Sequence, residues 1–317
     1  MAIINYRKLG NSGLKVSPVG LGTNNFGGRL DIEGSRKVIY KALDSGINFF
    51  DTADIYGNKG GSETILGEVL GVRRKDIILA TKFGNQFDDE GKLKGASRHY
   101  IFSAIEASLK RLKTDWIDLY QIHRPDANTP IDETIRALDD LIRQGKVRYL
   151  GLSNFLPWQI VEAQLIAKEL GANRFISSQD EYNLLKRNIE GDYTDVISAY
   201  GLGLLPYFPL ASGVLSGKYQ RDIAPPENSR LANNPRLSSR YLSDRNWQIL
   251  AALDAFSKAH GHTLLELAFS WLLAKPFVSS VIAGASTAEQ LEANINAANW
   301  VFTPEELAEI DRITAST

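Results

Sequence analysis

Short apolar runs alternate with longer stretches of helical periodicity along this chain of 317 residues. An apolar side chain at every third or fourth position forms one helical face, whereas a short continuous apolar run is typical of a buried strand. The stretches at 98–112 and 131–144 therefore predict amphipathic helices. Eight apolar runs predict buried strands, at 19–22, 47–50, 77–80, 117–122, 147–152, 175–178, 202–205 and 278–282.

The alternation of strand and helix predicts the fold class. The first five intervals between strand ends are about 25 to 42 residues, the size of one βα unit, which implies parallel strands covered by helices. Eight such units favour an α/β fold of the closed (β/α)8 TIM-barrel type over an open doubly wound sheet. We expect a single domain over 1–317, with an N-terminal β-hairpin at 9–14 that closes the bottom of the barrel, a long loop after strand seven from 207 to about 244, and a C-terminal helix.

Composition and charge exclude several classes of protein. Without Cys, the chain has no disulfide, thiolate nucleophile or Cys-based zinc site. A net charge of −1 gives no general attraction to nucleic acid or anionic membranes. The uncharged stretch at 196–217 is long enough to span a membrane, but Pro206 and Pro209 would break a continuous helix, so we interpret it as a helix end, a strand and a loop. The N-terminus does not look like a signal peptide, so we expect a cytoplasmic protein; the sequence does not indicate its oligomeric state.

Polar residues follow directly after several predicted strands, where a barrel places its active site. Asp51, Lys82 and His123 follow the second, third and fourth runs, and Tyr56 comes five residues after Asp51. A buried Asp–Lys pair beside a tyrosine would lower the phenol pKa from about 10, and a histidine can donate a hydrogen bond to a carbonyl oxygen. Each residue alone also suits a structural role, such as a helix cap or a solvated strand end. Their joint position predicts a site for acid catalysis.

Several segments resemble the motifs of the aldo-keto reductases. They are Asp-Thr-Ala-Asp-Ile-Tyr-Gly at 51–57, Ala-Thr-Lys at 80–82, Tyr-Gln-Ile-His at 120–123, Gly-Leu-Ser-Asn at 151–154, and the stretches 209–219 and 282–286. The resemblance extends from about residue 9 to residue 310, in the expected order. It implies a barrel that binds an extended nicotinamide cofactor without a Rossmann fold and transfers hydride between this cofactor and a carbonyl.

The resemblance also implies roles for individual residues. Tyr56 would be the general acid, Asp51 and Lys82 would tune it, and His123 would orient the carbonyl. The nicotinamide would be held by Ser153, Asn154 and Gln179 at its carboxamide and by Tyr207 against its ring. The rest of the cofactor site would consist of Gly22, Thr23, Asp51, Pro209, Leu210, Ser212, Gly213, Leu215, Gly217, Lys218, Gly284, Ser286, Gln290 and Asn294. The substrate contacts would be Phe26, Tyr56, Phe83, His123 and Arg124.

The choice between the two nicotinamide cofactors depends on charges near the adenosine end. The long loop is locally basic and suits a flap over the phosphates, although a solvated surface would have the same composition; its cations are Lys218, Arg221, Arg230, Arg236, Arg240 and Arg245. Many members that prefer NADP have Arg where Ser286 stands, and often an acid where Ala293 stands. We therefore expect NADP(H) first, because it predominates in the family, with NAD(H) as the alternative.

The resemblance implies an oxidoreductase, and we expect no metal site in this sequence. His260 and His262 have no nearby carboxylate at ligand spacing, so we expect them to end a helix and not to bind a metal. The expected activity is reduction of an aldehyde or ketone, or oxidation of the corresponding alcohol or sugar, with a small molecule as the partner. Two alternatives remain open. One is a cofactor-binding regulatory subunit with little turnover, and the other is a barrel lyase that uses Lys82 as a Schiff base.

Overall fold

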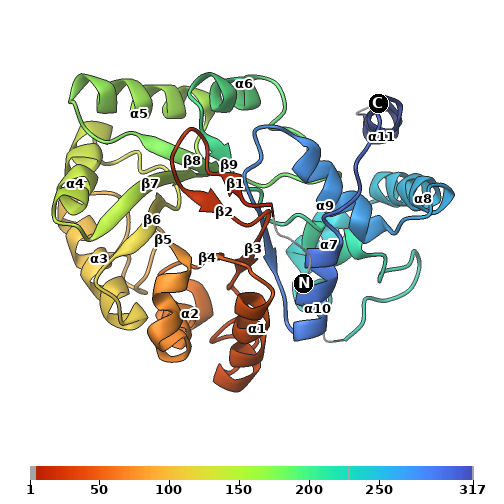
Figure 1. The fold of residues 1–317 in the computed structure, drawn as a ribbon, viewed down its shortest axis with the longest axis horizontal. Coiled ribbons are helices and arrows are strands. Elements are labelled where there is room, and N and C mark those ends of the chain that lie inside the picture. Colours follow the sequence, from red (N-terminus) through yellow and green to blue (C-terminus); the bar gives the residue numbers. More distant parts are fainter. Residues whose placement is uncertain (1–4, 228, 316–317) are drawn as a thin grey trace.

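Eight parallel strands form one sheet that curls into a barrel with helices outside it (Figure 1). The computed structural model describes residues 5–227 and 229–315. The strands run in the order β10-β3-β4-β5-β6-β7-β8-β9. Their bounds are β3 (Val19–Gly22), β4 (Phe49–Asp51), β5 (Ile78–Phe83), β6 (Ile117–Ile122), β7 (Val147–Ser153), β8 (Phe175–Gln179), β9 (Gly203–Leu204) and β10 (Val281–Gly284). The predicted (β/α)8 architecture is confirmed.

The ring closes between β9 and β10 through a short seam. Leu204 forms a parallel bridge with Val278, just before β10 begins. The Leu204 amide donates to Phe277 O at 2.8 Å, and the Ser279 amide donates to Leu204 O at 2.9 Å. By contrast, β10 and β3 pair through four residues each. The sheet is therefore continuous around the barrel, but it is joined least extensively at this seam.

The helices cover the outside of the barrel with their apolar faces turned inward. In α3, Ile101, Ile105 and Leu109 are buried at helical spacing, as the periodicity predicted. The predicted helix at 131–144 is confirmed as α4, one residue shorter. The helices are α1 (Ile32–Asp44), α2 (Tyr56–Leu70), α3 (Arg98–Leu112), α4 (Ile131–Arg143), α5 (Pro157–Glu169), α6 (Asp192–Ala199), α7 (Pro235–Tyr241), α8 (Asp244–Ala259), α9 (Leu264–Ala274), α10 (Ala288–Asn296) and α11 (Pro304–Thr314).

An antiparallel hairpin closes one end of the barrel. It consists of β1 (Arg7–Lys8) and β2 (Lys15–Val16), drawn in red in Figure 1. Leu9 and Val16 are fully buried in a cluster that also contains Phe49 from β4. The hairpin therefore fills the barrel end opposite the C-terminal ends of the strands, as the sequence predicted.

The segment after β9 contains more regular structure than the expected loop. It includes a 3₁₀ helix, η2 (Ala211–Ser216), and the helix α7. Asn234 caps α7 by accepting a hydrogen bond from the Leu237 amide, and Pro235 occupies the first helical position. The sequence around Asn234 and Pro235 thus starts a helix that the apolar pattern alone did not indicate.

The stretch at 196–217 is the end of α6, then β9 and η2, as interpreted from its prolines and glycines. No helix within 5–227 and 229–315 is long and apolar enough to cross a membrane. Residues 1–4, which belong to the N-terminus used to predict the location of the protein, lie outside the described residues.

Candidate active site

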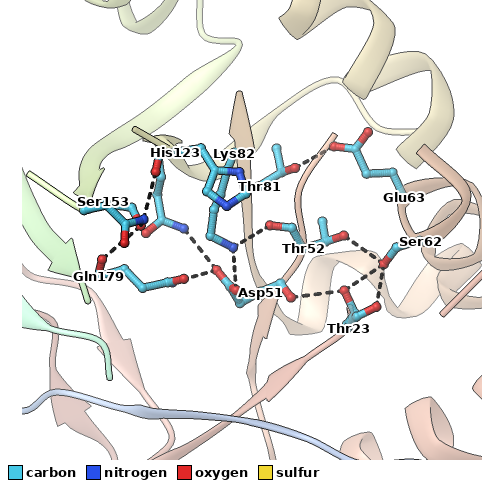
Figure 2. A network of polar contacts seen from close by, with 12 residues as sticks. Thr23, Asp51, Thr52, Ser62, Glu63, Thr81, Lys82, His123, Ser153 and Gln179 are labelled. Carbon is cyan, nitrogen blue, oxygen red and sulfur yellow. Dashed lines mark hydrogen bonds and ion pairs between the residues drawn. The ribbon is translucent and has the colours of Figure 1, made fainter. Parts of the chain in front are cut away.

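A buried ion pair lies at the C-terminal end of the barrel strands (Figure 2). Lys82 in β5 places its Nζ 2.6 Å from Oδ2 of Asp51, the last residue of β4. The same Nζ donates to the backbone oxygen of Thr52 at 2.9 Å. Lys82 is 0% exposed and Asp51 is 2% exposed. A charge pair with so little water is retained only when its other polar atoms also have partners.

Two side-chain amides satisfy the other oxygen of Asp51. Gln121 in β6 and Gln179 at the end of β8 each donate from Nε2 to Asp51 Oδ1, both at 3.0 Å. Side chains from β5, β6 and β8 thus all bond to the carboxylate that β4 supplies. Sequence reasoning missed Gln121, although one signal was present: it is a polar residue inside the apolar run 117–122. In the sheet it pairs directly with Lys82.

Tyr56 and His123 lie beside this ion pair. Lys82 Nζ is 5.0 Å from the centroid of the Tyr56 ring. The rings of Tyr56 and His123 meet edge to face with centroids 5.8 Å apart. The backbone amide of His123 donates to Phe83 O at 2.8 Å, which ties it to the end of β5. The structure therefore brings together all four residues that the sequence singled out for acid chemistry.

Burial dominates the protonation of these groups. Burial raises the pKa of the Tyr56 phenol above its ordinary value, while the Lys82 ammonium acts in the opposite direction. The net shift is upward, so the expectation of a lowered phenol pKa was wrong for this state, because desolvation exceeds the effect of the ammonium. Burial also lowers the pKa of Lys82, but Asp51 and Tyr56 more than compensate, and its pKa is raised.

His123 is neutral at pH 7. Burial holds its pKa well below the ordinary value, and the charges of Lys82 and Arg124 lower the pKa further. Its Nδ1 is buried and has no hydrogen-bond partner among the described residues. A neutral imidazole has one N–H donor and one acceptor, so this ring can still donate to a ligand.

A left-handed turn follows Tyr56 immediately. Gly57, Asn58, Lys59 and Gly60 have φ values of 67°, 60°, 66° and 98°. Left-handed backbone costs L-residues roughly 1–2 kcal/mol each, so two non-glycine residues in such a turn are unusual. A Cβ at Gly57 would overlap Phe26 O and lie 2.6 Å from the Ser62 amide. Strain of this kind is common at functional sites, and this turn begins one residue after Tyr56.

Asn154 connects the ends of β6, β7 and β9. It has a left-handed φ of 60°. Its Nδ2 donates to His123 O at 3.0 Å, and its Oδ1 accepts from the Tyr207 hydroxyl at 2.8 Å. Ser153, one residue earlier, donates from Oγ to Gln179 O at 2.9 Å. The resemblance assigns the side-chain amides of Asn154 and Gln179 to the nicotinamide carboxamide. Here the same amides bond to other residues of the site.

A cavity of about 640 Å³ extends from Tyr56 and His123 to the start of α10. Its size lies within the range of small-molecule and cofactor sites. Arg124 lies on its wall. The predicted cofactor residues that line it are Gly22, Thr23, Asp51, Ser153, Asn154, Gln179, Tyr207, Pro209, Leu210, Ser212, Gly213, Lys218, Gly284, Ser286, Gln290 and Asn294.

Four predicted ligand contacts do not reach this cavity. Phe26 and Phe83 are 0% exposed and belong to the hydrophobic core, where Phe83 stacks on Tyr120 with centroids 4.6 Å apart. Leu215 is likewise fully buried in the core, and Gly217 lies just beyond η2, outside the described lining. The side chains of Phe26, Phe83 and Leu215 pack in the core, and ligand contacts from these three residues and from Gly217 stay a prediction.

Asn25 links the two sides of the cavity and was not among the predicted site residues. Its Nδ2 donates to Ser286 Oγ at 3.3 Å, and its Oδ1 accepts from Arg230 Nη2 at 3.3 Å. The signal in the sequence was a run of three polar residues, Thr23, Asn24 and Asn25, directly after the first barrel strand. The other lining residues that were not predicted as contacts are Asn24, Arg29, Glu181, Phe208, Ser216, Arg240, Leu265, Ile282, Ala283 and Ala293.

The two C-terminal histidines have structural contacts. His260 ends α8, and its Nδ1 lies 2.8 Å from Phe256 O. His262 stacks on Trp300 with centroids 4.1 Å apart. The described part of the chain contains no group of three or more His, Cys, Asp or Glu side chains placed to hold a metal ion.

The fold is a (β/α)8 barrel, and the cluster of Asp51, Tyr56, Lys82 and His123 lies at the C-terminal ends of its strands, where such barrels place their active sites. A family profile described as "Aldo/keto reductase family" matches residues 18–315. The chain belongs to this family and is an oxidoreductase.

Similar proteins cover almost the whole chain. A probable voltage-gated potassium channel subunit beta of Oryza sativa subsp. japonica is 38% identical over 321 residues, which span 98% of this chain and 97% of that protein. A protein with the same name in Arabidopsis thaliana is 39% identical over 322 residues, covering 98% and 97%. The L-glyceraldehyde 3-phosphate reductase of Escherichia coli O157:H7 is 36% identical over 319 residues, covering 97% and 91%.

Proposed function

We propose that this protein reduces an aldehyde or ketone with a nicotinamide cofactor, reversibly, and that Tyr56 is the general acid. The observation that carries the proposal is the placement of Tyr56 and His123 at one end of an extended cavity, above the buried Asp51–Lys82 pair. A phenol, a neutral imidazole and an ammonium around one point suit a carbonyl oxygen that gains negative charge.

The residues of the cavity fit a nicotinamide cofactor. Tyr207 offers an aromatic ring beside the acid group, and Ser212 has a buried Oγ with no partner among the described residues. At Gly22 a Cβ would approach Ile282 of the neighbouring strand to 3.0 Å, so this part of the wall is tightly packed. Lys218 supplies a cation for the diphosphate. When bound, the reduced cofactor would supply a hydride to the carbonyl carbon.

Residues of this chain would transfer the proton to the carbonyl oxygen. Tyr56 would donate its phenolic proton to the carbonyl oxygen, and the Lys82 ammonium would stabilise the phenolate that remains. Asp51 would keep Lys82 charged and in place. His123, held neutral by burial, would donate a hydrogen bond that orients the carbonyl. In the reverse direction the phenolate would act as the base.

Substitution of Tyr56 tests the assignment. Tyr56→Phe removes only the hydroxyl, so carbonyl-dependent oxidation of the reduced cofactor should stop while cofactor binding persists. Turnover is followed by the loss of near-ultraviolet absorbance, and binding is followed by titration. Tyr40→Phe on exposed α1 is the matched control and should behave as the parent protein. Normal turnover by Tyr56→Phe would contradict the acid role.

We propose NADP(H) as the preferred cofactor because Lys218 and Arg230 add positive charge to the cavity. Ser286, which lies near Gln290 with its amide 2.9 Å from Oε1, adds none, and this keeps NAD(H) as the alternative. Titration with both reduced cofactors decides between them. Tighter binding of NADH than of NADPH would overturn the preference.

The lyase alternative has less support. Lys82 is fully buried, paired with Asp51 and has a raised pKa, whereas a Schiff-base lysine must be reachable and deprotonated. Borohydride in the presence of carbonyl compounds should therefore leave Lys82 unmodified. Trapping of substrate on Lys82 would favour the lyase.

A cofactor-binding regulatory subunit is the second candidate. The observation that favours it is the 38% and 39% identity to two plant proteins named as potassium channel subunits. Such a protein would bind the cofactor tightly, turn over slowly and assemble with a partner chain. Steady turnover with several small aldehydes, measured with the isolated chain, would exclude it.

A further inference from the structure

The cavity carries more positive than negative charge. Arg29, Arg124, Lys218, Arg230 and Arg240 line it, against Asp51 and Glu181. Both acids already have partners. Asp51 pairs with Lys82, and Glu181 accepts hydrogen bonds from Arg240 and from the Tyr241 hydroxyl. The wall of this cavity therefore attracts anions.

Besides Arg230, which opposes the rise that burial causes in the pKa of Tyr56, the acid site has a second cation on the cavity wall, Arg124. It follows His123 directly at the end of β6, and its side chain is exposed on the cavity wall. Its charge acts on both neighbouring rings: burial lowers the pKa of His123 and Arg124 lowers it further, while burial raises the pKa of Tyr207 and Arg124 opposes this. Arg124 therefore lines the same cavity as His123 and Tyr207, and its charge acts on both rings.

No acid of the described chain pairs with Arg124. The nearest acid in sequence, Asp126, is occupied by the Ala96 amide at 2.8 Å, the Asn128 amide at 2.9 Å and the Thr129 hydroxyl at 2.8 Å. Within 5–227 and 229–315, Arg124 forms no ion pair. Its charge is therefore available to a ligand.

The anionic groups of a dinucleotide would lie at the other end of the cavity. Arg230 bonds to Asn25, which in turn bonds to Ser286 near the start of α10. Lys218, two residues after η2, also lines the cavity. The nicotinamide itself carries no anionic group, so it does not need Arg124.

We propose that the substrate of this site is an aldehyde or ketone with an anionic group, a carboxylate or a phosphate, and that Arg124 binds this group. The inference rests on the proposed reductase function and specifies its substrate class. A guanidinium presents a planar pair of donors that matches either anion, and a neutral side chain at this position would not discriminate.

Matched substrate pairs test the proposal. Succinic semialdehyde and butanal differ by a carboxylate, and glyceraldehyde 3-phosphate and glyceraldehyde differ by a phosphate. We expect kcat/KM to be at least about tenfold higher for the anionic member of one pair, mainly through KM. The pair with the larger ratio identifies the anion as carboxylate or phosphate.

Substitution of Arg124 should remove this preference. Arg124→Gln should reduce the ratio to about one, and Arg124→Lys should retain part of it because the charge remains. Arg136→Gln on the exposed face of α4 removes a positive charge away from the cavity and should leave the ratio unchanged.

Binding without reaction provides a second measurement. Butyrate has the charge but no aldehyde, and butyramide is its neutral counterpart. Calorimetry should detect tighter binding of butyrate by the parent chain, and this difference should disappear in Arg124→Gln.

Equal kcat/KM values within both substrate pairs, or an equal loss for both members in Arg124→Gln, would overturn the inference. If neutral aldehydes are reduced without regard to charge, the substrate class is wrong but the reductase function stands. If no carbonyl compound is reduced at all, the proposed function itself fails.

Discussion

Gln121 donates its side-chain amide to Asp51 Oδ1 at 3.0 Å, from a strand two places away in the barrel. Removing this donor leaves a buried carboxylate less completely satisfied. We expect Gln121→Leu to lower kcat about tenfold, with little change in KM, because Asp51 would hold Lys82 less rigidly beside Tyr56. Steady-state kinetics and the pH profile of kcat measure the effect.

Gln164→Leu is the matched control for this prediction. Gln164 is also a buried amide, and it donates to Phe175 O at 2.9 Å on the outside of the barrel. Its loss should reduce the free energy of unfolding but leave kcat unchanged. If Gln121→Leu and Gln164→Leu affect kcat equally, the amide at 121 has only a structural role.

Lys82→Met should reduce both turnover and stability. Without the ammonium, the pKa of Tyr56 rises further, so the phenol becomes a weaker acid, and kcat should fall about a hundredfold or more. Asp51 would also be left as a buried, unpaired charge, which typically costs 3–5 kcal/mol. Denaturant unfolding and single-turnover kinetics measure the two effects.

The double variant Asp51→Asn with Lys82→Met separates the effect on turnover from the effect on the free energy of unfolding. It removes both charges, so it should recover most of the free energy of unfolding but none of the turnover. Recovery of turnover in the double variant would contradict the role of the ammonium.

Gly57→Ala should displace Tyr56. The residue has a φ of 67°, and a Cβ there would overlap Phe26 O. We expect a loss of kcat by about a hundredfold, because a small displacement of the acid is costly, together with reduced stability. Gly145→Ala at the end of α4 is the control: its φ is 75°, but no atom lies within 4 Å of the added Cβ. Equal kinetic effects in both variants would show that the turn does not position the phenol.

Asp54 should make stability depend on pH. Burial and the nearby Glu63 raise the pKa of Asp54 from 3.8 to about 7. Because the folded state holds this proton more strongly than the unfolded chain does, the contribution of Asp54 to the free energy of unfolding should fall as pH rises from about 4 to 7, by at most about 4 kcal/mol. Denaturant unfolding at pH 5 and pH 8 measures the difference.

Asp54→Asn stays neutral and should show a smaller decrease over this range. Asp115→Asn, which replaces an exposed acid, should follow the parent chain. An unchanged slope in Asp54→Asn would mean that Asp54 ionises in the folded state as it does in the unfolded chain.

The sequence predicted the barrel well because each strand is an apolar run and each helix has an apolar face. The end of a strand was less predictable where the strand contains a charged residue. The run at 77–80 stops before Lys82, yet β5 continues to Phe83, since Lys82 is neutralised by Asp51 from the neighbouring strand. A pairing between distant segments is not visible in a local pattern.

The direction of the side chains could not be predicted from the sequence either. Parallel strands are buried on both faces, so their composition does not alternate, and no pattern showed that the side chain of Phe83, expected at the substrate, packs in the core. Position in the chain gave the four acid-site residues but not Gln121 or Asn25. The pKa of Tyr56 was misjudged because it depends on how completely the hydroxyl is buried, which only the packed structure determines.

The cavity is lined by residues from both sides of the seam between β9 and β10. Tyr207 and Leu210 follow the strand on one side of the seam, and Ile282 and Gly284 belong to the strand on the other; all four face the same hollow. A ligand that contacts residues on both sides of the seam would link β9 and β10 at the point where the barrel is joined least extensively. Amide hydrogens around Leu204 and Val278 should then exchange more slowly with solvent once the hollow is filled.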